Sequence, residues 1–98
     1  MDTPLPHALF VELETLSDPR SPHRRQHKLV DLVTIALCAV LSGADSWVDV
    51  AEWGRSKEPW LRTFLELPAG IASHDTFSRL FRLLDPQALE AVLLDWVR

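Results

Sequence analysis

Three consecutive residues, Ser73, His74 and Asp75, have the side chains of a nucleophilic triad. A triad needs hydrogen bonds that run from the hydroxyl to the imidazole and on to the carboxylate. Consecutive side chains on a helix point about 100° apart, so these three do not converge if the run is helical. The run is better explained as the beginning of a helix with Ser73 as its N-cap. We therefore assign no catalytic residue.

Two histidines, His23 and His27, are four residues apart and could share one helical face as metal ligands. A structural zinc site takes four ligands, and Cys38 is the only cysteine in the chain. We interpret the pair as part of an exposed basic loop. The carboxylates are scattered, whereas a metal-dependent nuclease core needs a longer mixed fold. We expect no metal and no cofactor.

The residues most suited to binding lie on and before a predicted helix near the C-terminal end. Two helices joined by a Pro/Gly turn, near residues 59–84, have the form of a helix-turn-helix-like pair. The N-terminal half of the second helix presents polar and basic side chains that can contact phosphates or base edges. The alternative interpretation is an ordinary solvated face. The candidates are Ser73, His74, Thr76, Ser78, Arg79 and Arg82.

A second group of candidates lies in a short basic segment, residues 20–28. It contains four Lys and Arg residues and no acid, which suits a phosphate backbone. Its alternative interpretation is a solubilising loop. These candidates are Arg20, Arg24, Arg25 and Lys28.

Net charge argues against a uniformly basic nucleic-acid binder. The 98 residues carry 10 Lys and Arg against 14 Asp and Glu, a formal net charge of −4. The charge is uneven, because residues 1–19 and residues 29–52 contain acids and no base. A total of −4 therefore hides the basic segment and leaves room for one DNA-binding face.

The elements that must position these side chains are all helices. Length predicts one domain, residues 1–98, and no stretch alternates with period two for long enough to be a strand. We predict an all-α, compact bundle of about five to six short helices. Their expected bounds are 7–16, 25–42, 46–57, 59–65, 73–84 and a last helix from Pro86.

Local signals support these bounds. The helix over 25–42 is apolar almost all round, which is typical of a central helix with Cys38 in its core, and Gly43 is a good left-handed cap. Ser46 can cap the next helix, with Asp49 near its first turn. Asp85 can cap the last helix, where Leu89, Val92, Leu93 and Trp96 face inward.

The four tryptophans have two interpretations. At helical spacing among Leu, Val and Phe they are core residues, and we predict this for Trp60 and Trp96 first and for Trp47 and Trp53 second. The alternative is a stacking platform for single strands. The chain has no basic, apolar leader and no apolar run long enough for a bilayer, so we expect a cytoplasmic protein without a membrane partner.

Six motifs occur in one order along the chain: Leu16–Arg20, His27–Leu29, Ile35–Leu41, Gly43–Trp47, Trp60–Leu61 and Ser73–Phe77. In this order they resemble the N-terminal domain of H-repeat-associated proteins, which are DDE-type insertion-sequence transposases. The resemblance covers about Leu9 to Trp96. It implies a setting in transposition, DNA at transposon ends as partner, and a separate catalytic domain of RNase H-like fold that this chain lacks. It implies no catalysis by these residues. Ala72 departs from the family, where proline is common.

Two functions of different classes follow. In the first, a helical domain binds or positions DNA through the helix over 73–84, with the basic segment on the backbone. In the second, the domain is a protein-interaction module that pairs transposase subunits, another copy of itself included, or docks on the catalytic domain. A decayed transposase remnant without present activity is the third, weaker alternative.

Overall fold

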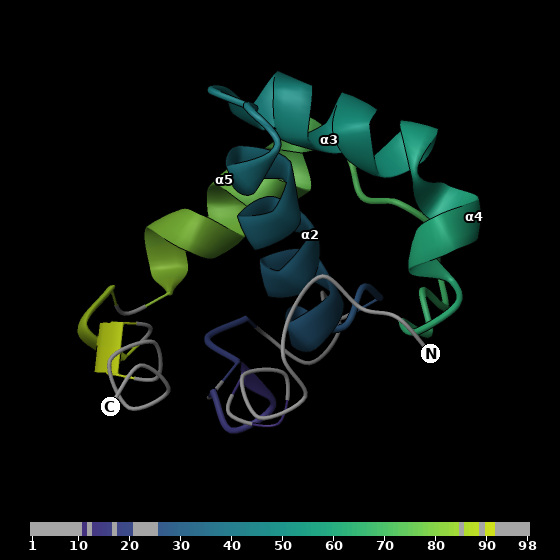
Figure 1. Ribbon diagram of the computed structural model, residues 1–98. Helices are drawn as coiled ribbons and strands as arrows, with labels where there is room; N and C mark the ends of the chain where they lie inside the picture. The colour runs from purple at the N-terminus through teal and green to yellow at the C-terminus, as the bar shows by residue number, and fades with distance from the viewer. Residues whose placement is uncertain are drawn as a thin grey trace.

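One almost wholly buried helix, α2 (Leu29–Leu41), forms the centre of the fold, and Figure 1 shows further helices across its end, behind it and to its side. The computed structural model describes residue 11 and residues 13–16, 18–20, 26–84, 86–88 and 90–91, and in these the regular elements are helical. The prediction of an all-α bundle is confirmed. The other helices are α3 (Trp47–Ser56), α4 (Glu58–Leu61) and α5 (His74–Leu83).

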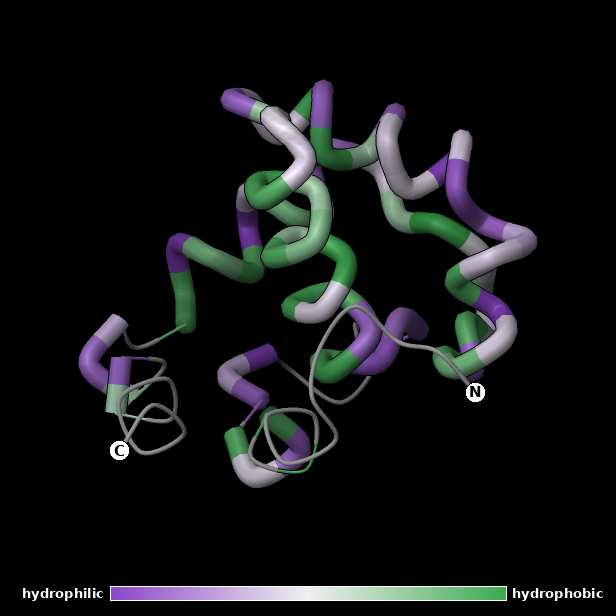
Figure 2. The backbone as a smooth tube through the Cα atoms, viewed as in Figure 1, coloured by the Kyte–Doolittle hydropathy of each residue, from purple (hydrophilic) through white to green (hydrophobic). Residues whose placement is uncertain are grey.

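The sequence of α2 explains its central position. Every residue from Leu29 to Ala36 is buried, followed by Cys38 and Ala39. Figure 2 shows hydrophobic residues concentrated along this helix, while the outer side of α3 is more hydrophilic. A helix that is apolar on all sides must be covered on all sides. The predictions of a central helix and of a core position for Cys38, which is 3% exposed, are confirmed.

The N-terminal end of α2 lies later than predicted. The helix begins at Leu29 rather than near residue 25, and residues 26–28 are not helical. The backbone at Lys28 is extended, with φ −69° and ψ 140°. The carbonyl oxygen of His27 accepts a hydrogen bond from the Arg20 guanidinium at 2.6 Å. That side chain holds the segment before α2 in place and fixes its non-helical path.

The C-terminal end of α2 has the predicted glycine cap. Gly43 has φ +106°, a conformation that glycine adopts without strain. Its amide donates to Val40 O at 3.0 Å, and the Ala44 amide donates to Ala39 O at 2.9 Å. This pair of hydrogen bonds is the Schellman motif, which satisfies the last carbonyls of a helix.

Helix α3 crosses the end of α2 and also packs against α5 (Figure 1). As predicted, Ser46 caps it, because the Ser46 hydroxyl accepts from the Asp49 amide at 3.1 Å. Val50, Ala51 and Gly54 face the core. A Cβ on Gly54 would lie 3.0 Å from Ile71 Cγ2, so any larger residue would have to displace the Ile71 side chain slightly.

Helix α4 is shorter than predicted. It begins with Pro59 in its first turn, as expected, but ends at Leu61 instead of Leu65. The Thr63 hydroxyl donates to Trp60 O at 2.6 Å, and the Phe64 amide donates to Leu61 O at 3.1 Å. Together with the Leu65 amide, which donates to Leu61 O at 2.8 Å, these contacts form the turns over residues 62–64 that follow α4.

A buried carboxylate fixes the loop that follows. Asp31 of α2 is 2% exposed and accepts a hydrogen bond from the Leu67 amide at 3.0 Å. Leu67 has φ +47°, which is uncommon for a residue with a branched side chain, yet its side chain is 2% exposed. Burial of Leu67 and its bond to Asp31 together stabilise this backbone.

Helix α5 has the predicted apolar stripe. Phe77, Leu80 and Leu84 are buried, and Phe81 is half-buried against the same core. Residues 86–88 and 90–91 are helical, in agreement with the expected last helix. Most of the helix expected over 7–16 lies outside the described residues. The same holds for the cap and core residues predicted for the last helix, Asp85, Leu89, Val92, Leu93 and Trp96.

The tryptophan prediction is partly wrong. Trp60 is 37% exposed, although it was expected in the core, and it makes edge contacts with Trp53 at 6.5 Å and with Phe64 at 5.2 Å. Trp47 is half-buried and stacks on Phe81 at a ring distance of 4.9 Å.

Candidate nucleic-acid interface

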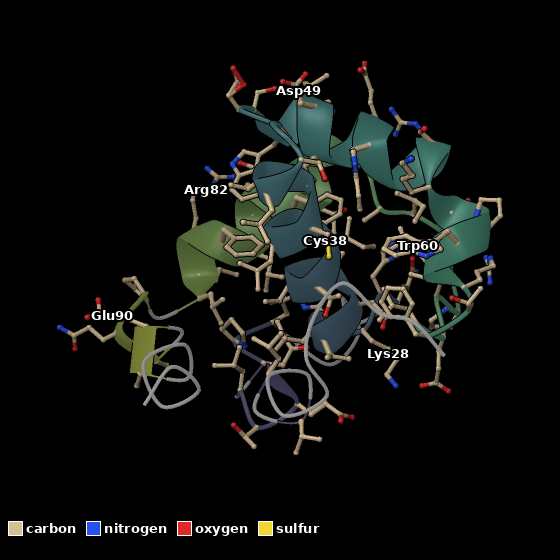
Figure 3. All side chains as sticks on the ribbon, viewed as in Figure 1. Lys28, Cys38, Asp49, Trp60, Arg82 and Glu90 are labelled. Atoms are coloured by element: carbon tan, nitrogen blue, oxygen red, sulfur yellow. The ribbon has the colours of Figure 1, made fainter. Side chains whose placement is uncertain are left out.

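The outward side of α5 presents polar and basic side chains to solvent. Arg79 and Arg82 are exposed and three residues apart, so they lie on neighbouring positions of one helical face. Figure 3 shows Arg82 at the edge of the molecule, away from the buried Cys38. Among the described residues, neither guanidinium forms a hydrogen bond or ion pair. We therefore keep both as candidates for contact with an anionic partner.

The first turn of α5 is built by its cap. The Ser73 hydroxyl accepts from the Thr76 amide at 3.4 Å and lies 3.3 Å from the Thr76 hydroxyl. His74 Nε2 lies 3.4 Å from Asp75 Oδ1, and both side chains are more than half exposed. Ser73 thus serves the helix start, which confirms the cap interpretation over a triad. Thr76 and Ser78 are half-buried at the edge of this face.

Arg20 lies in a different environment from the other candidates. Its side chain is 6% exposed and forms an ion pair with Asp18, with Nη2 to Oδ2 at 2.7 Å and Nε to Oδ1 at 2.9 Å. Its third contact is the His27 carbonyl described above. A bidentate, buried pair of this kind is a structural contact. We therefore revise the expectation for Arg20 and leave it out of the candidate surface.

The other members of the basic segment contribute less than expected. Lys28 is exposed but paired with Glu66, and this hydrogen bond raises the pKa of Lys28 and lowers the pKa of Glu66. A phosphate would have to compete with that carboxylate. Arg24 and Arg25 lie outside the described residues. The structure thus brings together the candidates on α5 and does not join Arg20 to them.

Of the two histidines considered as metal ligands, His23 and His27, the structure describes His27. Burial lowers the pKa of His27, and a hydrogen bond with the Gly70 backbone works in the opposite direction. His23 lies outside the described residues. Within the described part of the chain, no group of three or more His, Cys, Asp or Glu residues could hold a metal ion.

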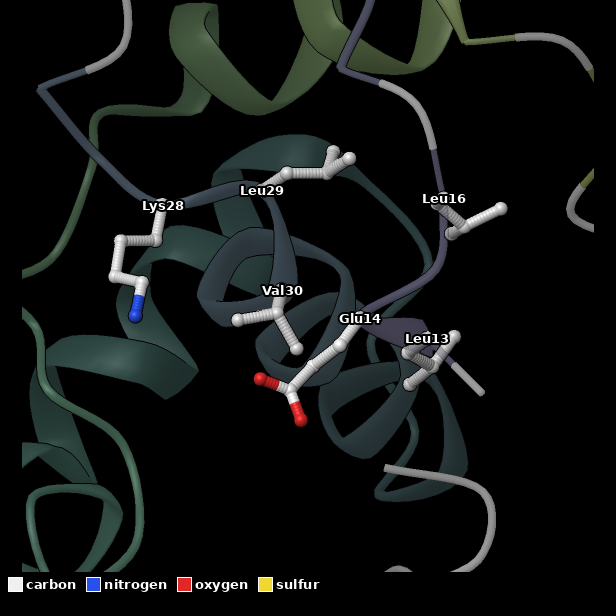
Figure 4. Close-up of a pocket in the computed structure, with 6 residues that line it drawn as sticks. All are labelled: Leu13, Glu14, Leu16, Lys28, Leu29 and Val30. Atoms are coloured by element: carbon white, nitrogen blue, oxygen red, sulfur yellow. The ribbon is translucent and has the colours of Figure 1, made fainter. Parts of the chain in front are cut away.

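A small hollow lies beside the first turn of α2 (Figure 4). Its volume is about 200 Å³, and Lys28 and Glu14 are its charged lining residues. The apolar lining consists of Leu13, Leu16, Leu29 and Val30.

A larger hollow, of about 430 Å³, lies where α2 ends and α3 begins. Sequence reasoning missed it, because an apolar helix centre was assumed to be covered along its whole length. Val40 is 57% exposed and Leu41 79% exposed. The nearby Gly43 cap and Ser46 cap were the available signals, since they place a sharp turn directly after these two side chains. The hollow is lined by Val40, Ala44, Asp45, Ser46, Trp47 and Val50.

Comparison with known proteins identifies the setting. A family model described as DDE_Tnp_1-associated matches residues 10–97. An uncharacterized protein in the dhlA 3′ region of Xanthobacter autotrophicus is 57% identical over 85% of this chain and 28% of its own length. The H repeat-associated putative transposase YhhI of Escherichia coli is 29% identical over 92% of this chain and 24% of its own length. This chain thus spans about a quarter of the length of these two relatives.

A third relative is closer in length. The inactive transposase YbfQ of Escherichia coli is 32% identical over 74% of this chain and 86% of its own length. No solved structure matches the chain. No helix of the described residues has the length and hydrophobicity to cross a bilayer. The family model covers nearly the whole sequence, and the chain belongs to the DDE_Tnp_1-associated family, a family of N-terminal domains of DDE-type transposases.

Proposed function

We propose that this domain binds DNA through the outward face of α5 and positions it for a transposase catalytic domain, without catalysing a step itself. The observation that carries the proposal is the pair Arg79 and Arg82, exposed and without an internal partner among the residues the structure describes. Most protein–DNA hydrogen bonds go to phosphate and sugar, and arginine is a leading donor. The family supplies the setting in transposition.

The architecture supports a helix that enters a groove. The inward side of α5 is anchored by Phe77 and Leu80, both 0% exposed, so its outward side is held on a rigid support. The N-terminus of a helix favours a phosphate, and Ser73 and His74 lie there. Asp75 opposes this attraction at the same end, which favours phosphate contacts at Arg79 and Arg82.

The partner helix differs from the predicted helix-turn-helix. Helix α4 is one turn long and residues 62–73 separate it from α5, whereas α5 packs on α3. A helix-turn-helix joins its helices by a turn of about three to four residues. The proposal therefore rests on α5 and its support by α3. The cytoplasmic location expected from the sequence is part of this proposal.

Fluorescence anisotropy with labelled transposon-end DNA tests the proposal. Arg79→Ala with Arg82→Ala should weaken binding, because two phosphate contacts are lost. Arg55→Ala with Lys57→Ala is the matched control, since both side chains are exposed and the change in net charge is the same. Equal weakening by the two double variants would show a general charge effect and contradict a specific role of α5. A scrambled duplex measures end specificity.

A second candidate function is favoured by a separate observation. The apolar side chains of Val40 and Leu41 are exposed at the end of α2, and exposed apolar patches mark sites of protein interaction. Docking onto another part of a transposase, or onto another copy of this chain, would cover them. Light scattering at increasing concentration reports self-association.

A further inference from the structure

The surface around the junction of α2 and α3 combines an open apolar hollow with exposed acidic side chains, and residues 39–54 contain no Lys or Arg. We infer that it is a docking site for a basic amphipathic helix of a protein partner, with large aliphatic side chains on one face and Lys or Arg at the edges. This inference deepens the second candidate function and is independent of DNA binding by α5.

The apolar component is a built hollow. Val40, from the end of α2, and Trp47 and Val50, from the start of α3, line it together with Ala44 of the turn between the two helices. The volume of about 430 Å³ accepts aliphatic side chains from a partner. Helix-in-groove recognition uses such a surface, in which apolar anchors at i, i+3, i+4 and i+7 enter the groove.

The floor of the hollow is rigid. Trp47 stacks on Phe81 of α5 at 4.9 Å and is parallel to Phe77, with an interplanar angle of 2°. The Schellman motif and the Ser46 cap fix the two helix ends that form its walls. A pre-formed surface loses little conformational entropy when a partner binds.

Charge selects the partner. The exposed charged residues between Ala39 and Gly54 are Asp45, Asp49 and Glu52, and the segment contains no Lys or Arg. Asp45 itself lines the hollow. A second copy docked through the same patch would bring these carboxylates against one another, and like charges at an interface cost several kcal/mol. A basic helix removes this repulsion and gains attraction.

Isothermal titration calorimetry with synthetic helices of about 14 residues tests the inference. The probe is a Leu/Lys peptide with the repeat LKKLLKL, and its control has Glu in place of Lys. The Leu/Lys peptide should bind and the Leu/Glu peptide should not. The binding should weaken as salt is raised.

Two pairs of variants locate the binding. Leu41→Lys should weaken binding of the Leu/Lys peptide about tenfold, while Leu83→Lys, equally charged and also exposed at the end of α5, should not. Asp45→Asn should weaken it, and the exposed Glu90→Gln should not. If circular dichroism shows that Leu41→Lys does not fold, the comparison of Asp45→Asn with Glu90→Gln tests the site by itself.

Several results would overturn the inference. Equal binding by all variants would show general attraction to an acidic protein. A dimer that dissociates in Leu41→Lys, seen by light scattering, would identify a second copy as the occupant. Failure of the peptide to bind would remove the docking site and leave the DNA measurements on α5 unaffected.

Discussion

Asp31 fixes the path of the loop between α4 and α5 through its contact with Leu67. It is a buried carboxylate on an otherwise apolar helix, and it accepts a hydrogen bond from the Leu67 amide. Burial raises its pKa, while the bond from Leu67, Lys28 and His27 act to lower it. Glu66, paired with Lys28, adds to the rise. Burial of this carboxyl costs free energy, and the hydrogen bond that it accepts stabilises the positive φ of Leu67.

Replacing Asp31 separates the hydrogen bond from the charge. Asp31→Ala leaves the Leu67 amide without its acceptor and should lower the free energy of unfolding by about 1–3 kcal/mol. Asp31→Asn retains an amide oxygen as acceptor and should cost less. Urea denaturation of the two variants checks the order, and equal losses would show that the hydrogen bond contributes nothing.

The same residue predicts a pH dependence of stability. Because the folded carboxyl binds its proton more tightly than the unfolded one, the contribution of Asp31 is fully present below its ordinary pKa of 3.8. It is lost as the pH rises through the raised folded value. The stability of the wild type relative to Asp31→Asn should therefore fall with rising pH and then level off. Denaturation curves from about pH 3 to about pH 8 measure it, and a difference that rises with pH would contradict the account.

Cys38 offers a check on the rigidity of the core. Burial raises the pKa of its thiol to about 11, and the side chain is 3% exposed. Only the thiolate is an effective nucleophile. Ellman's reagent should therefore leave Cys38 unmodified in the native protein at neutral pH and react with it in guanidinium chloride. Rapid native labelling would mean that α2 opens locally.

At the scale of elements, α3 connects the central helix to the proposed DNA-binding helix. It packs on both α2 and α5, and Ser46 fixes its beginning. Ser46→Ala should lower the free energy of unfolding by about 1 kcal/mol, because one amide of the first turn loses its acceptor. Ser56→Ala, at the exposed last residue of α3, is the control and should be nearly neutral. A larger loss at Ser56, measured by thermal melting, would contradict this.

Local signals in the sequence were sufficient to predict one end of most helices. Gly43, Ser46, Pro59 and Ser73 mark ends that the structure confirms, because caps act through atoms close in sequence. The predicted N-terminal end of α2 was wrong, because the non-helical segment before α2 is held by the hydrogen bond from Arg20 to the His27 carbonyl. The same long-range contact removed Arg20 from the candidate site.

At the scale of the whole molecule, the net charge of −4 sets the condition for DNA binding. The acidic residues around the α2–α3 junction and the basic residues of α5 must face different partners, because phosphates repel the former and attract the latter. Two surfaces of opposite character on one small domain fit a module that connects DNA with another part of a transposase. The pairing of Lys28 with Glu66 leaves Arg79 and Arg82 as the principal described cations of this proposal.

The salt dependence of DNA binding tests the central claim most directly. Anisotropy titrations at several salt concentrations give the slope of log K against log salt, which is about −0.9 per neutralised phosphate. We predict a steep slope for the wild type and a slope shallower by about 2 for Arg79→Ala with Arg82→Ala, with weaker binding throughout. The Arg55→Ala with Lys57→Ala control should keep the wild-type slope. Absence of binding at low salt, or a slope unchanged by loss of both α5 arginines, would contradict the account.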